Sequence, residues 1–126
     1  MIQIYLDCNY PKNLVEALQL IHKLQVPNGF TITRTQQFEE KNISNKVVFL
    51  FDTGKRGIDV VTEKHYEAGF KVFAFKLNST EHIDFFQLSL STIHLWPKML
   101  NAISEEKKPF VFTYNYNGTR LTKAKG

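Results

Sequence analysis

The stretch Val47-Val48-Phe49-Leu50-Phe51 is apolar at every position, and Asp52 follows it directly. An uninterrupted apolar run of this kind is typical of a central strand in a parallel sheet, whose two faces are both covered. Towards the N-terminus, residues 2–6 are β-branched and aromatic and predict a strand that stops at Asp7. Towards the C-terminus, residues 71–77 predict another strand.

Helical periodicity follows the first predicted strand. Asn9 is placed to cap a helix, and Pro11 suits its first turn. Apolar residues then recur every three or four positions, which predicts one buried stripe made of Leu14, Leu18, Ile21 and Leu24. The pair Asn28-Gly29 ends this pattern, and residues 30–34 predict the next strand.

Two more helices are expected between later strands. Residues 56–68 predict a helix that ends at Gly69. Residues 82–95 predict another, and Pro97 either kinks it or begins a second helix that runs through residue 102. The apolar positions that keep helical spacing in this segment are Phe86, Leu90 and Ile93.

The last predicted elements form a hairpin. Phe110–Tyr114 predicts a strand, Asn117-Gly118 is a strong turn signal, and residues 119–122 are expected to fold back on that strand. Strands that alternate with helices predict an α/β fold, here a three-layer α/β/α domain with a mostly parallel central sheet and a C-terminal hairpin. A length of 126 residues fits a single domain over 1–126.

Composition excludes several classes of protein. With 43% hydrophobic and 22% charged residues, the chain is unlike disordered, collagen-like or transmembrane sequences. The single cysteine, Cys8, forms neither an internal disulfide nor a cysteine-rich zinc site and indicates a reducing compartment. The N-terminus lacks the basic and apolar regions of a signal peptide, so we expect a cytoplasmic protein with no membrane contact. A net charge of +4 weakly favours anionic partners.

Acidic residues end two of the predicted strands. Asp7 and Asp52 would lie at the carboxyl ends of parallel strands, the edge where open α/β sheets bind ligands. Converging carboxylates hold hard divalent cations, and Glu39 or Glu40, from the segment before the central strand, are further candidate ligands. The alternative is local, because aspartate is also common at strand ends and helix caps for its own hydrogen bonds.

Basic residues follow Asp52. Lys55 and Arg56 stand where a loop enters the next predicted helix, and together with free backbone amides they could grip a phosphate, or form a basic loop of no special role. Asp59, Glu63 and Glu67 share one face of that helix, which we interpret as a solvated surface paired with lysines. The four histidines show no paired spacing for zinc, and no glycine-rich phosphate loop is present.

Several short motifs together resemble the PIN-like domains of the VapC toxin type. They are Asp7-Cys8-Asn9-Tyr10-Pro11, Val47 to Asp52 with Lys55-Arg56-Gly57, Glu67-Ala68-Gly69-Phe70-Lys71-Val72-Phe73, Leu95-Trp96-Pro97-Lys98-Met99 and Lys108-Pro109-Phe110-Val111-Phe112. Their order covers nearly the whole chain. The resemblance departs from the family between the first two motifs, where Phe38-Glu39-Glu40 stands in place of an Asp-Glu-x-Trp type segment.

The resemblance implies a nuclease that hydrolyses RNA with Mg²⁺ or Mn²⁺. It assigns catalysis to Asp7, Asp52 and Glu40, and metal binding to these three residues and Glu39. It further implies that Lys55 and Arg56 contact the RNA substrate, that Asn9 orients a water molecule, and that a cognate antitoxin protein masks the acidic pocket. Separately, exposed aromatic residues among the seventeen in the chain could form the interface of a homodimer.

Two alternatives belong to other classes of protein. One is a catalytically inert PIN-like module that binds an antitoxin, RNA or a larger assembly, which the reduced set of acids favours. The other is a receiver-like phosphoacceptor, since Lys108-Pro109-Phe110 resembles the Lys-Pro-Phe element of receivers. Chain order argues against the receiver, because a strand and hairpin rather than a helix are predicted after Lys108.

Overall fold

The computed structural model describes residues 2–25, 30–35, 46–51, 58–76, 84–116 and 120–126. Within these ranges the elements are, in chain order, β1 (Ile2–Asp7), α1 (Lys12–Gln25), β2 (Phe30–Thr35), β3 (Lys46–Phe51), α2 (Ile58–Glu67), β4 (Lys71–Phe75), α3 (Phe85–Glu105), β5 (Phe110–Tyr114) and β6 (Thr122–Lys125). The alternation of strands and helices confirms the predicted α/β class.

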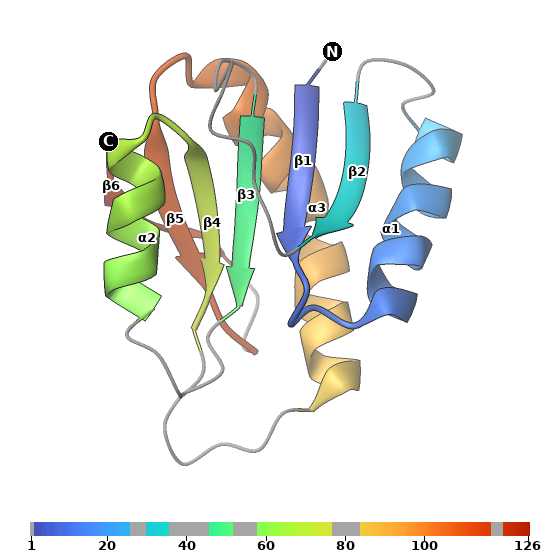
Figure 1. The fold of residues 1–126 in the computed structure, drawn as a ribbon. Coiled ribbons are helices and arrows are strands. Elements are labelled where there is room, and N and C mark those ends of the chain that lie inside the picture. The colour runs from blue at the N-terminus through green and yellow to red at the C-terminus, as the bar shows by residue number, and fades with distance from the viewer. Residues whose placement is uncertain (1, 26–29, 36–45, 52–57, 77–83, 117–119) are drawn as a thin grey trace.

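The strands form one six-stranded sheet in the order β2-β1-β3-β4-β5-β6 (Figure 1). All neighbours are parallel except β5 and β6, which are antiparallel. Every residue of β3 is buried, which confirms that the apolar run starting at Val47 is a central strand covered on both faces. The mostly parallel sheet is therefore as predicted.

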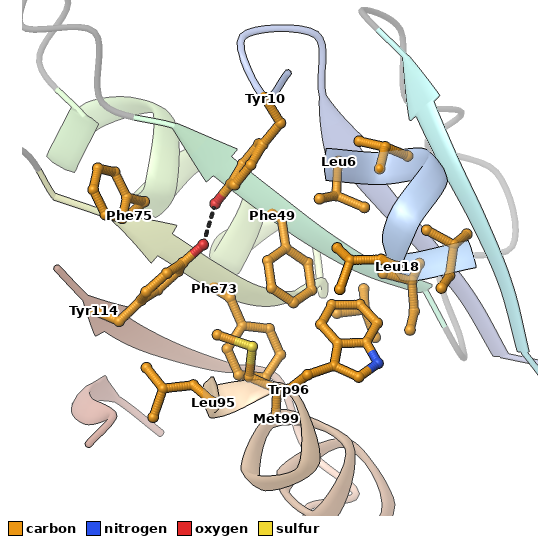
Figure 2. Packing of buried hydrophobic residues seen from close by; sticks show 14 of the residues in the cluster. Leu6, Tyr10, Leu18, Phe49, Phe73, Phe75, Leu95, Trp96, Met99 and Tyr114 are labelled. Atoms are coloured by element: carbon orange, nitrogen blue, oxygen red, sulfur yellow. Dashed lines mark hydrogen bonds between the residues drawn. The ribbon is translucent and has the colours of Figure 1, made fainter. Parts of the chain in front are cut away.

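Helices cover both faces of the sheet, with α1 and α3 on one face and α2 on the other (Figure 1). We call the apolar layer under α1 and α3 the large core; it contains, among others, Leu6, Leu18, Phe49, Phe73, Leu95, Trp96 and Met99 (Figure 2). We call the layer under α2 the small core, whose buried members are Val48, Leu50, Phe70, Val72 and Val111. Alternate residues of β3 thus serve the two cores, as the pleat of a strand requires.

The connection from β4 through α3 to β5 has an uncommon hand. The connections β3-α2-β4 and β4-α3-β5 both move in the same direction across the sheet, but their helices lie on opposite faces. They must therefore have opposite hands. The connection through α2 is right-handed in Figure 1, so the one through α3 belongs to the left-handed minority, about 2% of such crossovers.

The buried stripe of α1 differs from the prediction. Leu14 and Leu18 are buried as expected, but Leu24 is 85% exposed and Ile21 is also on the solvent side. Four-residue steps from Leu14 lead instead to His22, whose ring packs edge-on against that of Phe30 with 4.9 Å between centroids. A polar residue, His22, therefore completes the buried face of α1. The apolar spacing alone predicted the neighbouring residue, Ile21, at this place.

The first half of α3 also turns differently from the prediction. The helix begins at Phe85 because the Asp84 side chain caps it, accepting from the N–H groups of Phe86 and Gln87. It then continues through Pro97 without a break. Leu88 and Leu95 face the large core, whereas the predicted stripe of Phe86, Leu90 and Ile93 is exposed. Both sides of this segment are apolar, so periodicity could not choose between them.

Helix α2 is described from Ile58, and its predicted start at residue 56 lies outside the described residues. It ends at Glu67, one residue before the predicted end, and Gly69 closes it as predicted. Gly69 has a φ of 99° and its N–H donates to the Tyr66 carbonyl, while the Phe70 N–H donates to the His65 carbonyl. These two bonds form a Schellman cap, which needs the left-handed backbone that glycine permits. The returning strand β6 lies at Thr122–Lys125 rather than at residues 119–122, and the predicted Asn117-Gly118 turn falls outside the described residues.

Candidate functional site at the carboxyl edge

Asp7 ends β1 and joins it to the end of β3. Its Oδ1 accepts a hydrogen bond of 2.6 Å from the N–H of Asn9, and its Oδ2 accepts one of 3.0 Å from the N–H of Phe51. A carboxylate has about four lone-pair sites, so each oxygen keeps one for a further ligand. Because Phe51 immediately precedes Asp52, the Asp7 carboxylate contacts the residue next to the second predicted acid.

This edge is also the switch point of the sheet. From β1 the chain moves to β2 on one side, and from β3 it moves to β4 on the other. The connecting helices α1 and α2 lie on opposite faces, so the chain diverges between the carboxyl ends of β1 and β3 (Figure 1). Open α/β sheets bind ligands in this crevice. Asp7 stands at this position.

Arg34, in β2, fixes the loop that follows Asp7. Its Nε donates to the Tyr10 carbonyl at 2.8 Å, and its Nη2 donates to the Cys8 carbonyl at 2.7 Å. The planar guanidinium thus spans two carbonyl groups of one turn, and the Tyr10 N–H closes the same turn on the Asp7 carbonyl at 3.0 Å. Sequence reasoning missed this role. The available signal was an arginine at the end of the strand predicted over residues 30–34.

A buried chain of hydroxyls lies below this turn. The hydroxyl oxygens of Tyr10 and Tyr114 are 2.9 Å apart (Figure 2), and that of Tyr114 is 3.0 Å from the Oγ1 of Thr92. Thr92 donates to the Leu88 carbonyl at 2.8 Å, and Tyr10 lies 3.4 Å from the Leu50 carbonyl. All three hydroxyl residues are buried. The chain links the turn after β1 to β5 and α3.

Counting protons gives the direction of this chain. Three hydroxyl protons serve four contacts, and both ends are carbonyls, which only accept. One contact must lack a proton, and the contact of 3.4 Å from Tyr10 to Leu50 is the longest. The short contacts are therefore satisfied when Tyr10 donates to Tyr114, Tyr114 donates to Thr92, and Thr92 donates to Leu88.

Burial keeps both tyrosines neutral. Desolvation is the main cause that raises the pKa of Tyr114 to about 12. Desolvation also raises the pKa of Tyr10 well above its usual value, and electrostatic interactions with Tyr114 and Asp7 act in the same direction. A tyrosine with so high a pKa is a poor general base or nucleophile near neutral pH. The pair therefore serves to position the turn that carries Asp7 and Asn9.

The structure brings together two of the seven predicted site residues, Asp7 and Asn9. Asn9 does not cap α1, which begins three residues later; its side chain is exposed, and its backbone N–H binds Asp7 instead. The other five predicted residues lie outside the described residues: Glu39, Glu40, Asp52, Lys55 and Arg56. Cys8, next to Asp7, is a half-buried free thiol.

The metal prediction rests on Asp7 within the described ranges. Among those residues no group of three or more His, Cys, Asp or Glu side chains could hold a metal ion. Asp7 itself suits a hard cation, because its carboxylate is oriented by two backbone donors and retains free lone pairs. The remaining ligands of the predicted set belong to the segments at 36–45 and 52–57.

Other charged residues from the sequence analysis have structural partners. Glu63 accepts from Lys125 at 2.7 Å, which confirms that it pairs with a lysine, and Glu106 accepts from Lys123 at 3.0 Å. The tail lysines thus connect β6 to α2 and to the end of α3. Lys108 precedes β5, so it lies at the amino edge of the sheet, away from Asp7.

Comparison of the chain with family models, curated proteins and solved structures finds no match. The resemblance to PIN-like domains therefore depends on the motifs in the chain itself. In the described part of the chain, no helix is both long and apolar enough to cross a membrane.

Proposed function

We propose that the protein is a metal-dependent ribonuclease with a PIN-like site between the carboxyl ends of β1 and β3. The observation that carries this proposal is the hydrogen bond of 3.0 Å from the Phe51 N–H to Asp7 Oδ2. It keeps a carboxylate with free lone pairs at the switch point, one residue from Asp52. The proposed three-layer PIN-like arrangement and the terminal hairpin agree with helices on both faces and with the antiparallel β5 and β6.

In this proposal Asp7 and Asp52, with Glu40 or Glu39, hold Mg²⁺ or Mn²⁺. Such an ion would make a coordinated water more acidic and would neutralise charge on a phosphodiester. Asp7 contributes a carboxylate whose orientation is already fixed by Asn9 and Phe51, so little reorganisation is needed on binding.

The basic residues act on the substrate. Lys55 and Arg56 are proposed to neutralise the RNA phosphate, and the exposed side chain of Asn9 to orient a water molecule beside Asp7. Arg34 is engaged with the Cys8 and Tyr10 carbonyls and acts by holding the turn rather than by contacting RNA. RNA as substrate and a free thiol both agree with the proposed cytoplasmic location.

The test is cleavage of a mixed RNA pool by the purified protein with and without Mn²⁺. We expect metal-dependent cleavage that falls by about a hundredfold or more in Asp7→Asn and in Asp52→Asn. Glu16→Gln is the matched control, because it removes the same charge from an exposed position on α1 that pairs with Lys12. Cleavage that survives in the double variant of Asp7 and Asp52 would show that the assignment is wrong.

The proposed cellular role is the toxin of a toxin–antitoxin pair. Its partner would be a small antitoxin that covers the acidic edge, and expression without that partner should halt growth. Normal growth, together with a crystal soaked in Mn²⁺ in which no metal contacts Asp7, would favour the inert binding module instead. In that case the edge would bind a partner without chemistry.

A homodimer through α3 belongs to the same proposal. Phe85, Phe86, Leu90 and Ile93 are exposed along the first half of this helix, and Phe86 reaches 85% exposure. Their spacing forms one continuous apolar stripe, and contiguous exposed apolar surfaces of a few hundred Å² commonly mark protein interfaces. Two copies related by a two-fold axis would bury the stripe against itself.

The receiver-like alternative loses support from the position of Lys108. The strand order β2-β1-β3-β4-β5 is shared with doubly wound phosphoacceptor folds. However, Lys108 stands at the edge opposite Asp7, so it cannot neutralise a phosphoryl group at the carboxyl edge of the sheet. We expect acetyl phosphate to leave the protein unmodified in an intact-mass measurement.

A further inference from the structure

A pocket of about 250 Å³ opens at the amino edge of the sheet, opposite the edge that carries Asp7. It lies between the beginnings of β1, β3 and β4 and the C-terminal end of α3. The residues that matter for its chemistry are Ile2, Val47, Lys71, Ile103, Glu106 and Lys107. No part of this pocket belongs to the proposed nuclease site.

The inner wall of the pocket is apolar. Val47 and Ile103 are buried among the large core, and Ile2 packs partly buried beside them. An apolar group of a ligand can pack against this wall, because its side chains belong to the hydrophobic core. The volume is smaller than that of a typical drug pocket and fits a ligand of about eight non-hydrogen atoms.

Lys71 contributes a partly buried ammonium group. Its Nζ donates to the Ile103 carbonyl at 2.8 Å, which satisfies one of the carbonyl groups at the end of α3. An ammonium has three N–H donors, so two are available for a ligand after this bond, the one that it makes within the described ranges. Desolvation lowers the pKa of Lys71, and the negative charge of Glu106 opposes that effect. An anion beside Lys71 would restore the electrostatic stabilisation that burial removes.

The remaining charges leave the pocket positive. Glu106 is the acidic residue among the lining groups, and its Oε1 already accepts from Lys123 at 3.0 Å. Lys107 stands on the rim as a second, exposed cation. Among the described residues at this place, Glu106 is the one carboxylate beside three lysines, Lys71, Lys107 and Lys123. The net charge around the pocket is therefore positive and favours a negatively charged ligand over a neutral or positive one.

We propose that this pocket binds a small organic carboxylate with a short apolar chain. The carboxylate lies against the free N–H groups of Lys71 with Lys107 at the rim, and the apolar chain lies against Val47 and Ile103. A charged group at the mouth and an apolar wall behind it favour an anion that carries an apolar chain over an anion without one, such as phosphate. Few contacts are made by so small a ligand, so we expect a dissociation constant of about 1 mM.

The probe is isovalerate, titrated into ¹⁵N-labelled full-length protein and followed by amide chemical shifts. We expect saturable shifts at Ile103 and Glu106 and none at Asn9, on the opposite edge. Two molecules of similar shape, isoamyl alcohol and isoamylamine, and inorganic phosphate separate the contributions of shape and charge. Each of the three should bind at least about tenfold more weakly than isovalerate.

Variants locate the site. Lys71→Met should weaken isovalerate binding by about tenfold or more, while Lys12→Met, which removes the same charge at the start of α1, should leave it unchanged. Since Lys71→Met also removes the bond to Ile103, a second variant tests the proposal without that loss. Glu106→Gln removes the competing carboxylate and should tighten binding by about threefold.

Three results would overturn the proposal. They are the absence of saturable shifts up to about 50 mM isovalerate, equal binding of phosphate or of the alcohol, and unchanged affinity in both Lys71→Met and Glu106→Gln. Equal binding of phosphate would reduce the pocket to a basic surface patch. Because Asp7 lies at the other edge, Asp7→Asn should bind isovalerate as the parent protein does.

Discussion

Replacing Tyr114 by phenylalanine tests the central role of its hydroxyl in the buried hydroxyl chain. The change removes the central hydroxyl and leaves the shape of the ring intact. Thr92 Oγ1 then loses the donor that stood 3.0 Å away, and Tyr10 loses its acceptor at 2.9 Å. Tyr10 can still donate to the Leu50 carbonyl, but at 3.4 Å that bond is long.

The expected cost follows from counting the bonds. A buried neutral hydrogen bond contributes about 1 kcal/mol net, so losing both contacts of Tyr114 costs about 2 kcal/mol. Tyr10→Phe removes one terminal donor and should cost about 1 kcal/mol. For a chain of this length, about 2 kcal/mol corresponds to a fall of about 8 °C in Tm.

Urea unfolding followed by the fluorescence of Trp96, the single tryptophan, measures these losses. Tyr5→Phe is the matched control, because the Tyr5 hydroxyl donates to Gln3 in an exposed position and should contribute less than about 0.5 kcal/mol. If Tyr114→Phe proved no more costly than Tyr10→Phe, the central role of Tyr114 in the hydroxyl chain would be refuted.

Three further predictions concern α1 and α3. Leu18→Ala should lower the free energy of unfolding by about 2 to 5 kcal/mol and Leu24→Ala by less than about 0.5 kcal/mol, because the two side chains are 1% and 85% exposed; equal losses in urea would contradict the orientation of α1. Burial lowers the pKa of His22 from 6.5, so the unfolded chain binds more protons between the lowered value and 6.5, and the stability present above pH 6.5 is lost as the pH falls through that window. His22→Phe should flatten this loss in thermal melts, and an unchanged slope would point to another group. Leu90→Asp should convert the proposed homodimer to monomer in light scattering, whereas a parent protein that is already monomeric would exclude this interface.

The sheet could be predicted because its signals are local. Phe110–Tyr114 was predicted with the bounds that the structure has, and the run from Val47 to Phe51 needed only one more residue at its start. A strand covered on both faces has apolar residues at every position, so no choice of face has to be made. The Gly69 cap was predictable for a similar reason, since few residues other than glycine adopt its backbone conformation.

Helix faces were harder because they depend on distant partners. His22 is buried since Phe30 and Trp96 surround its ring, and neither neighbour can be inferred from the periodicity of α1. In α3 the choice between Leu88 and Leu90 depends on which side of the helix meets the sheet. That side is set by packing against distant strands, which the periodicity of the helix does not encode.

The acidic residue of the candidate site was predictable from the sequence, but the residues that hold it in position were not. Asp7 was identified from its place after a strand, and its carboxylate does lie at the edge between β1 and β3. Arg34 and the hydroxyls of Tyr10 and Tyr114 were missed, because each acts on backbone or side chains far away in the sequence. Their contacts exist only once β2 and β5 have joined the sheet.

The large core contains many more buried residues than the small core, and this difference has a consequence for native-state motion. Detaching α2 uncovers only the small core, while α1 and α3 continue to seal the aromatic residues of the large core. Amide hydrogens of α2 should therefore exchange through a partial opening of lower free energy than those of α1 and α3, which require the whole domain to unfold. Local unfolding would be confined to the face of the sheet that α2 covers. A protease acting on the folded protein would therefore cleave first at α2.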